Sequence, residues 1–175
     1  MKKLKIDFDE IQKAAEDTER NAFDYFLDTE TGDVIVLSQD IIVRAEQTLE
    51  EAYDEDMADF DEVHFDEVTE IPDWMEDEVE LALNIFLHDK DRYERIPERI
   101  HSNGYSAMKE FSDTIENLQL KEHLLAILDG KGAFRRFKDA LEPYPKERKK
   151  WYGFNAAFAK KDIEKWLKTI GVEAE

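Results

Sequence analysis

The 175-residue sequence contains no cysteine and little glycine or proline. Without cysteine the chain forms no disulfides, performs no thiol chemistry and binds no cysteine-ligated zinc or iron–sulfur cluster. Only six glycines and four prolines are present, a scarcity that favours long helices over a turn-rich β-sandwich.

Long apolar runs are also missing. Runs such as Leu81–Leu87 are far shorter than the ~18 residues that a membrane span requires. The opening residues, MKKLKIDFDE, have basic side chains but no apolar stretch behind them, so they are not expected to be a signal peptide. A cytoplasmic location is therefore expected by default.

Enough apolar material is present for a folded core. Apolar residues make up 42% of the chain, including eleven phenylalanines and three tryptophans. A chain of this length buries about 70% of the surface that it exposes when unfolded. This composition argues against wholesale disorder, although 39% of the residues are charged.

The net charge of −20 is unevenly distributed along the chain. Residues 1–90 hold 29 acids and 7 bases, a net charge of −22, whereas residues 91–175 hold 15 acids and 17 bases, a net charge of +2. Within 131–168, 12 bases against 5 acids give +7. One explanation is that charged residues gather on the solvent-facing sides of helices and keep the protein soluble. The other is that the chain has two partner-binding surfaces of opposite charge.

The first part of the chain predicts a helix followed by a β-hairpin. Asp7 suits the N-cap of a helix that ends near Asp17. Residues 22–37 contain two aromatic and β-branched runs around a loop that Gly32 can close. Because a lone hairpin is marginal in water, it must pack on helices or pair with another strand.

A second helix is predicted up to about Asp54, capped by Ser38 or Asp40. Residues 54–70 then contain nine acids in seventeen positions, with the repeat Phe60–Val63 and Phe65–Val68 on either side of His64. A period of five fits neither a helix nor a strand. We expect a partly ordered acidic linker here.

The remaining residues predict helices joined by short connections. Pro72 suits the first turn of a helix with an apolar face of Met75, Val79, Ala82, Leu83 and Phe86, which Trp74 would broaden. Tyr93–Pro97 is expected to be a short extended connection, and Ser102 and Asn117 suit N-caps. The predicted helices cover residues 72–88, 102–115, 117–128, 132–142 and 146–170.

These elements predict an α+β fold that is mostly helical. The predicted organisation is a helix–hairpin–helix unit over residues 1–56, an acidic linker over 57–71 and a helical bundle over 72–175 with a basic last helix, all of which also fits one compact domain.

Catalytic and metal-binding motifs find little support. Gly104-Tyr105-Ser106-Ala107 begins like a nucleophile elbow but lacks the second glycine and the preceding strand, so it predicts a helix start. His64 lies among acids, yet no calcium loop or HExxH pair is present. We expect no metal, no cofactor and no catalytic residue.

The basic region offers a candidate surface for an anion or a nucleic acid. Gly130-Lys131-Gly132 predicts a tight turn, and free N–H groups at the start of the next helix, beside basic side chains, can hold an anion. The last helix is predicted to bury one side, with Trp151, Phe154, Phe158, Ile163, Trp166 and Ile170, and to expose lysines on the other, with Lys146, Lys149, Lys150, Lys160, Lys161 and Lys168. The candidate contacts are Lys131, Arg135, Arg136, Lys138, Lys149 and Lys150.

Several stretches together resemble a known bacterial group, uncharacterised protein family 0158. They are Phe26–Val34, Arg95–Pro97, Gly130–Asp139 and Arg148–Phe154, of which Gly130–Asp139 and the Trp-Tyr-Gly-Phe run are the most specific. The resemblance implies a small bacterial cytoplasmic protein and carries over no activity, substrate or catalytic residue.

The sequence favours a non-enzymatic binding or regulatory module that engages a protein partner through acidic surfaces, which would attract a basic partner. The acid–aromatic repeat supplies the candidate partner contacts Phe60, Asp61, Glu62 and Phe65. Two alternatives stay open: a nucleic-acid-associated protein using residues 131–168, and an enzyme with an anion pocket near Gly130–Arg136. No membrane partner is expected, and the sequence leaves the oligomeric state open.

Overall fold

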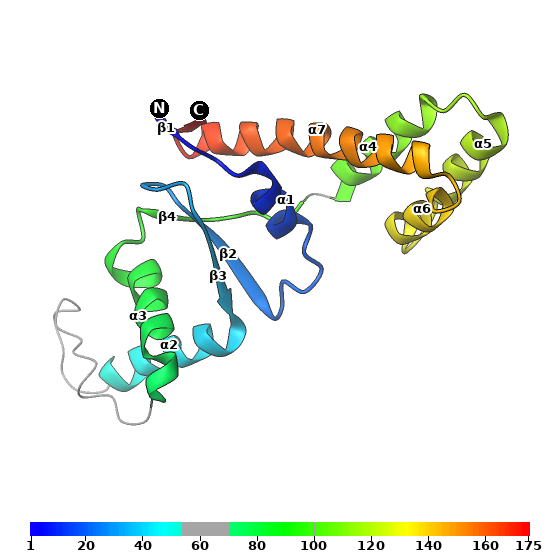
Figure 1. Cartoon of the computed structure of the whole chain (residues 1–175). Coiled ribbons are helices and arrows are strands. Elements are labelled where there is room, and N and C mark those ends of the chain that lie inside the picture. Colours follow the sequence, from blue (N-terminus) through cyan, green and yellow to red (C-terminus); the bar gives the residue numbers. More distant parts are fainter. Residues whose placement is uncertain (54–70, 100) are drawn as a thin grey trace. The chain divides into compact units, whose positions relative to one another are not determined.

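The computed structural model describes residues 1–53, 71–99 and 101–175 (Figure 1). The chain divides into two compact units. The helical unit comprises Met1, Phe8–Glu16 and Pro97–Glu173, and the mixed unit comprises Lys2–Asp7, Asp17–Ile96 and Ala174–Glu175. The architecture is α+β and mostly helical, as the sequence predicts.

The mixed unit is built on a three-stranded antiparallel sheet. Its strands are β2 (Phe23–Asp28), β3 (Val34–Ser38) and β4 (Tyr93–Arg95), in the order β3–β2–β4. The predicted hairpin is confirmed, and β4 supplies the additional pairing that a hairpin needs. The sequence predicted only an extended connection at β4, because three residues are too few to show a strand pattern.

Two helices cover one face of this sheet. They are α2 (Gln39–Tyr53) and α3 (Glu76–Leu83), the latter preceded by a 3₁₀ turn at Asp73–Met75 and continued by a π-helical turn at Asn84–His88. Ser38 is the N-cap of α2, since its Oγ accepts the N–H of Ile41 at 3.3 Å. The shared core consists of Phe26, Leu37, Ile41, Ile42, Ala45, Val79, Ala82, Leu83 and Ile85.

Two predicted members of the apolar face of α3 are wrong. Trp74 is 75% exposed because it lies in the 3₁₀ turn before the helix, where each residue advances the chain by about 120° instead of about 100°. The π-helical turn at the other end also shifts the register. Ile85 is therefore buried in place of Phe86, whose ring meets the ring of Phe26 edge to face.

The helical unit contains five α-helices in the described part of the chain. They are α1 (Phe8–Glu16), α4 (His101–Asp113), α5 (Leu118–Ile127), α6 (Ala133–Leu141) and α7 (Pro145–Thr169). Asn117 caps α5 as predicted, with its Oδ1 accepting the N–H of Leu120 at 3.2 Å. Helix α4 begins at His101, one residue before the predicted cap Ser102, so that cap stays a prediction. Two short strands, β1 (Lys2–Leu4) and β5 (Val172–Ala174), lie near the ends of the chain.

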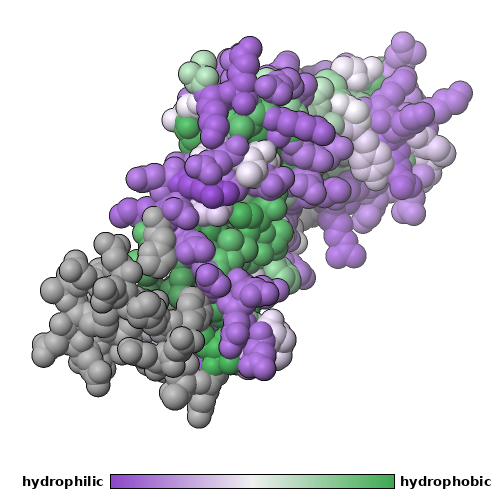
Figure 2. Space-filling model, turned by 60° about the vertical axis from the view of Figure 1, so that its left-hand side comes forward, coloured by the Kyte–Doolittle hydropathy of each residue, from purple (hydrophilic) through white to green (hydrophobic). Residues whose placement is uncertain are grey.

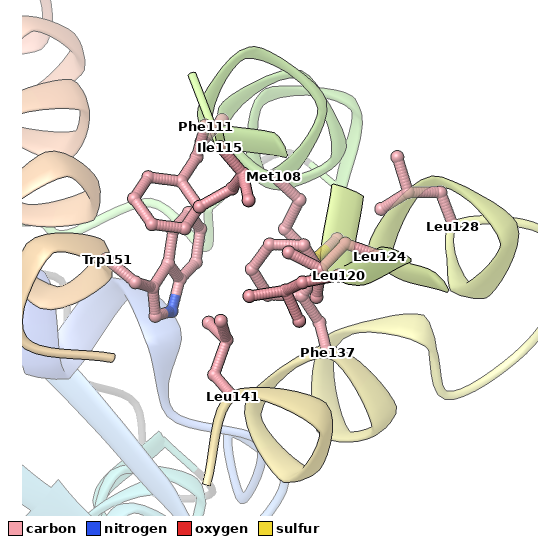
Figure 3. Close-up of a cluster of buried hydrophobic side chains, with 10 residues drawn as sticks. Met108, Phe111, Ile115, Leu120, Leu124, Leu128, Phe137, Leu141 and Trp151 are labelled. Atoms are coloured by element: carbon pink, nitrogen blue, oxygen red, sulfur yellow. The ribbon is translucent and has the colours of Figure 1, made fainter. Parts of the chain in front are cut away.

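An aromatic cluster fills the core of the helical unit (Figure 3). The ring of Trp151 lies 4.9 Å from that of Phe137 and 5.3 Å from that of Phe111, both edge to face. Leucines of α5 and α6 complete the cluster, among them Leu120, Leu124 and Leu141. Each fully buried large apolar side chain contributes about 2–3 kcal/mol, so this cluster is a main source of the unit's stability.

The long helix α7 buries a narrower stripe than the sequence predicted. Its buried residues recur every four positions: Trp151, Asn155, Ala159, Ile163 and Leu167. The predicted members Phe154, Phe158, Trp166 and Ile170 are only partly buried. The predicted lysine side is confirmed, because Lys146, Lys149, Lys150, Lys160, Lys161 and Lys168 are all exposed.

Neither unit is one continuous stretch of the chain. Helix α1 belongs to the helical unit, and α3 with β4 belongs to the mixed unit. A division at residues 57–71 stays a prediction, because nearly all of that stretch lies outside the described residues. Among the helices that the structure describes, none combines the length and apolar character needed to span a membrane.

Candidate functional site

The start of α3 places an exposed indole among carboxylates. Trp74 is 75% exposed, and Asp73, Glu76 and Asp77 are exposed beside it. The helix dipole stabilises these acids in the first turn of the 3₁₀ segment and of α3. We call these four residues the Trp74 surface. Its aromatic side chain is thus accompanied by three carboxylates close in sequence. On the face of the molecule that Figure 2 draws, hydrophobic areas lie among hydrophilic ones.

The two units differ strongly in charge. The mixed unit contains 29 acidic and 8 basic residues, a net charge of −21. The helical unit contains 15 acidic and 16 basic residues, a net charge of +1. All of the chain's excess negative charge thus belongs to one unit, the one that carries the Trp74 surface, and nine of its acids lie in residues 54–70, outside the described residues.

A partly buried ion pair joins the end of β2 to the residue before β4. The guanidinium of Arg92 binds the carboxylate of Asp28 in bidentate fashion, with Nε–Oδ1 and Nη2–Oδ2 distances of 2.9 and 2.6 Å. Burial alone would raise the pKa of Asp28, but the hydrogen bonds from Arg92 and from the N–H of Glu30 outweigh it and lower that pKa. Arg92 Nη1 also lies 3.2 Å from Glu30 Oε2, so the same guanidinium holds both the end of β2 and the loop that follows it.

A second polar network joins the start of β2 to the end of β4. The Tyr25 hydroxyl donates to Asp17 Oδ2 at 2.5 Å, and the guanidinium of Arg20 stacks 5.1 Å from the Tyr25 ring. Asp24 forms ion pairs with Arg20 at 3.3 Å and with Arg95 at 2.8 Å. The hydrogen bond to Asp17 raises the pKa of Tyr25 to about 12 and lowers the pKa of Asp17.

A polar seam connects helices of the helical unit. Arg99 Nη1 donates to Glu16 of α1 and, at 2.7 Å, to Asn155 Oδ1 of α7, and Asn155 Nδ2 donates to Glu16 Oε1 at 3.3 Å. The Arg99 side chain is 10% exposed, and its Nε and Nη2 have no hydrogen-bond partner within the described part of the chain. This triad was not predicted from the sequence. Its signal was the polar Asn155 within the four-residue spacing of buried positions on α7.

The predicted anion turn is closed by one of its own arginines. Gly130 and Gly132 both have positive φ, +93° and +74°, as the tight turn requires. Arg136 folds back over the end of α5, donating to the carbonyls of Ile127 and Asp129 at 3.2 and 2.9 Å and to that of Lys131. Its guanidinium therefore satisfies helix-end carbonyls.

The other five predicted basic contacts are exposed. Lys138 lies over the ring of Phe134 at 4.8 Å, and Lys150 lies 3.8 Å from Glu147. The exposed residues come from the α5–α6 turn, α6 and α7: Lys131, Arg135, Lys138, Lys149 and Lys150. Nothing in their contacts aims them at one common point.

The remaining predicted contacts cannot be placed. Phe60, Asp61, Glu62 and Phe65, like His64, lie outside the described residues. Gly104 and Ser106 lie within α4, as expected of a helix and not of a nucleophile elbow. Within the described ranges no group of three or more histidine, aspartate or glutamate side chains is placed to hold a metal ion.

The fold and surfaces define a mostly helical α+β protein with one strongly acidic unit. The chain belongs to the Uncharacterised protein family (UPF0158), whose family model matches residues 69–174. The most specific stretch of the sequence resemblance, Gly130–Asp139, lies inside this match. No curated protein and no solved structure matches the chain.

Proposed function

We propose that the protein is a non-enzymatic binding or regulatory module that engages a basic protein partner through its mixed unit. The observation that carries the proposal is the Trp74 surface, a 75% exposed tryptophan amid carboxylates on a unit of charge −21. A cytoplasmic location, which the proposal assumes, is the setting in which a cysteine-free acidic protein would meet such a partner.

Charge and aromatic area play different parts in this interaction. The negative unit attracts a basic partner at long range and speeds association, an effect that weakens as salt is added. Tryptophan is enriched among the few residues that supply most of the affinity in protein interfaces. Trp74 would therefore supply most of the binding affinity. The acids Asp73, Glu76 and Asp77 would increase the association rate and favour basic partners over acidic ones.

The test uses Trp74→Ala with Leu118→Ala as its matched control. Leu118 is 72% exposed but belongs to the helical unit, so its truncation also removes an exposed apolar side chain. Immobilised wild type and Leu118→Ala should retain the same basic proteins from a lysate at about 0.05 M NaCl and release them at about 0.5 M. Trp74→Ala should retain less of these proteins at both salt concentrations. Equal retention by all three baits, or retention that ignores salt, contradicts the proposal.

A second candidate is association with nucleic acid through residues 131–168. The observation that favours it is the exposure of Lys131, Arg135, Lys138, Lys149 and Lys150 on a unit whose net charge of +1 does not repel phosphate. Filter binding of RNA and DNA at about 0.05 M salt tests it, since phosphate contacts are strongest at low salt. Failure to bind either polymer removes this candidate. An enzyme with an anion pocket near Gly130–Arg136 is less favoured, because Arg136 is already bound to carbonyls.

A further inference from the structure

Strand β3 forms one edge of the sheet in the mixed unit. The strand order β3–β2–β4 leaves β3 paired on one side only, within the residues that the structure describes. Val36, at the centre of the strand, is 52% exposed. An edge strand of this kind presents unpaired N–H and C=O groups that can template another chain.

The hydrogen-bond alternation shows which groups point outward. The N–H of Asp28 donates to the carbonyl of Asp33, and the N–H of Gln39 donates to that of Ala22. In an antiparallel pair the bonded positions alternate, so Ile35 and Leu37, between these two points, bond β2. The backbone N–H and C=O groups of Val34 and Val36 consequently point away from β2.

The strand itself lacks the residues that usually block strand addition. Its sequence, Val-Ile-Val-Leu-Ser, contains no charge, proline or glycine. Natural edge strands are commonly protected by such residues. Acids stand instead just beyond both ends, at Asp33 and Asp40, and both are exposed.

These acids determine which chain the edge accepts. A second copy pairing antiparallel about Val36 would bring Asp33 of one copy near Asp40 of the other, at both ends of the new pair. It would also join two units of charge −21, and like charges across an interface are unfavourable. An extended segment with basic residues meets favourable charge at both ends.

We propose that the β3 edge binds an extended, basic segment of the partner protein by strand addition, with the Val34 and Val36 backbone groups as its hydrogen-bonding contacts. This inference rests on the proposed function, because it specifies how the basic partner is held. Backbone bonds supply affinity in such complexes, and side chains at alternate positions supply specificity.

The test compares Val36→Pro with Val36→Thr in the full chain. Proline removes the outward N–H of residue 36 but leaves the hydrogen bonds of Ile35 and Leu37 to β2 intact. Proline is tolerated at an edge-strand position whose N–H points away from the sheet. Threonine keeps the N–H and suits a strand. The probe is a short synthetic peptide of alternating lysine and threonine, with a glutamate–threonine peptide as the charge-reversed control.

Amide exchange, followed by nuclear magnetic resonance, should slow at Val34 and Val36 of the wild type when the lysine peptide is added. Val36→Thr should bind this peptide as the wild type does, and Val36→Pro should bind it about tenfold more weakly, the cost of roughly one hydrogen bond and its alignment. Unchanged amide dispersion outside β3 checks that Val36→Pro is folded.

The outcomes separate the inference from the proposed function. Equal peptide binding by all three chains, or binding without slower exchange at Val34, overturns strand addition while the basic-partner proposal stands. Exchange that slows as protein concentration rises in the absence of peptide assigns the edge to a second copy and also overturns it. Absence of any salt-sensitive partner or peptide binding overturns both.

Discussion

Among single residues, Tyr25 and Asp17 share a hydrogen bond whose contribution to stability depends on pH. Folding raises the pKa of Tyr25 from 10.0 to about 12, because its hydroxyl donates to the Asp17 carboxylate. A group whose pKa is higher in the folded state stabilises the fold fully below its unfolded pKa. We therefore expect the free energy of unfolding to fall as the pH rises from 10 through about 12.

Tyr25→Phe tests this pair and keeps the ring that stacks on Arg20. The variant should be about 1 kcal/mol less stable at neutral pH, the net value of a typical hydrogen bond, and its difference from the wild type should shrink above pH 10. Urea denaturation between pH 7 and 12 measures both effects. Tyr152→Phe, at an exposed tyrosine of α7, is the control, and a constant difference for Tyr25→Phe across the range would contradict the prediction.

The polar seam gives a second prediction at the residue scale. Arg99 donates hydrogen bonds to both Glu16 and Asn155. Removing either charge of the Arg99–Glu16 pair therefore leaves the other charge without its ion-pair partner and largely shielded from water. Arg99→Met and Glu16→Gln should each destabilise the chain, with a coupling energy of about 1–2 kcal/mol in a double-mutant cycle. Additive effects in the cycle would show that the pair contributes nothing beyond its separate members.

Residues of this kind were the hardest to predict from the sequence. Asp28 and Glu16 are two of 44 acids, and nothing local distinguishes a carboxylate that meets an arginine 64 or 83 positions away. Caps are different, because Asn117 bonds the N–H of Leu120 only three residues on. Local geometry could therefore be predicted, whereas charge pairing between distant segments could not.

At the scale of elements, the periodic and capped segments were predictable. The hairpin of β2 and β3 and the long helix α7 follow from their own residues and lie close to their predicted bounds. Strand β4 was not predictable as a strand, since it depends on the presence of β2 as a partner. The 3₁₀ and π turns around α3 change the helical rotation, which is why a uniform period misplaced Trp74 and Phe86.

Two glycines give a paired prediction about elements. Gly32 has φ +86°, and a Cβ on it would lie 2.4 Å from the carbonyl oxygen of Lys5, a backbone atom that cannot easily move. Gly153 lies within α7, where an added Cβ would meet nothing within 4 Å beyond the backbone of its own helix. Gly32→Ala should destabilise the chain by about 2 kcal/mol or more, through strain at positive φ and the clash. Gly153→Ala should stabilise it by about 0.5–1 kcal/mol, the helix-propensity difference.

Thermal unfolding of the two variants measures both signs in one experiment. Because Gly153→Ala adds the same methyl group, it controls for the added side chain itself. A Gly32→Ala chain as stable as the wild type would mean that the β2–β3 loop shifts away from Lys5 at little cost. A destabilised Gly153→Ala chain would contradict the open surroundings of that position.

At the scale of the whole molecule, both units are assembled from separated stretches of sequence. The mixed unit includes Lys2–Asp7 and Ala174–Glu175, and the N–H of Glu175 donates to the carbonyl of Leu4 at 2.9 Å. The helical unit takes α1 from the beginning of the chain. Composition shifts along the sequence mark boundaries only between consecutive segments. They therefore could not predict that each unit combines segments from distant parts of the chain.

The charge difference between the units predicts how salt changes stability. In the described part of the mixed unit, 20 acids face 8 bases, so folding brings an excess of negative charge together, whereas the 15 acids and 16 bases of the helical unit nearly balance. Raising NaCl from about 0.01 M to about 0.5 M shortens the Debye length from about 30 Å to about 4 Å and screens that repulsion. Sodium chloride serves better than sulfate, which stabilises proteins by exclusion from their surface.

Hydrogen exchange should therefore slow with salt at core amides of the mixed unit, such as Leu37 and Ile41, and change much less at Leu124 and Trp151 of the helical unit. Faster exchange in the mixed unit at high salt would mean that its ion pairs, such as Asp28–Arg92, outweigh the repulsion among its acids.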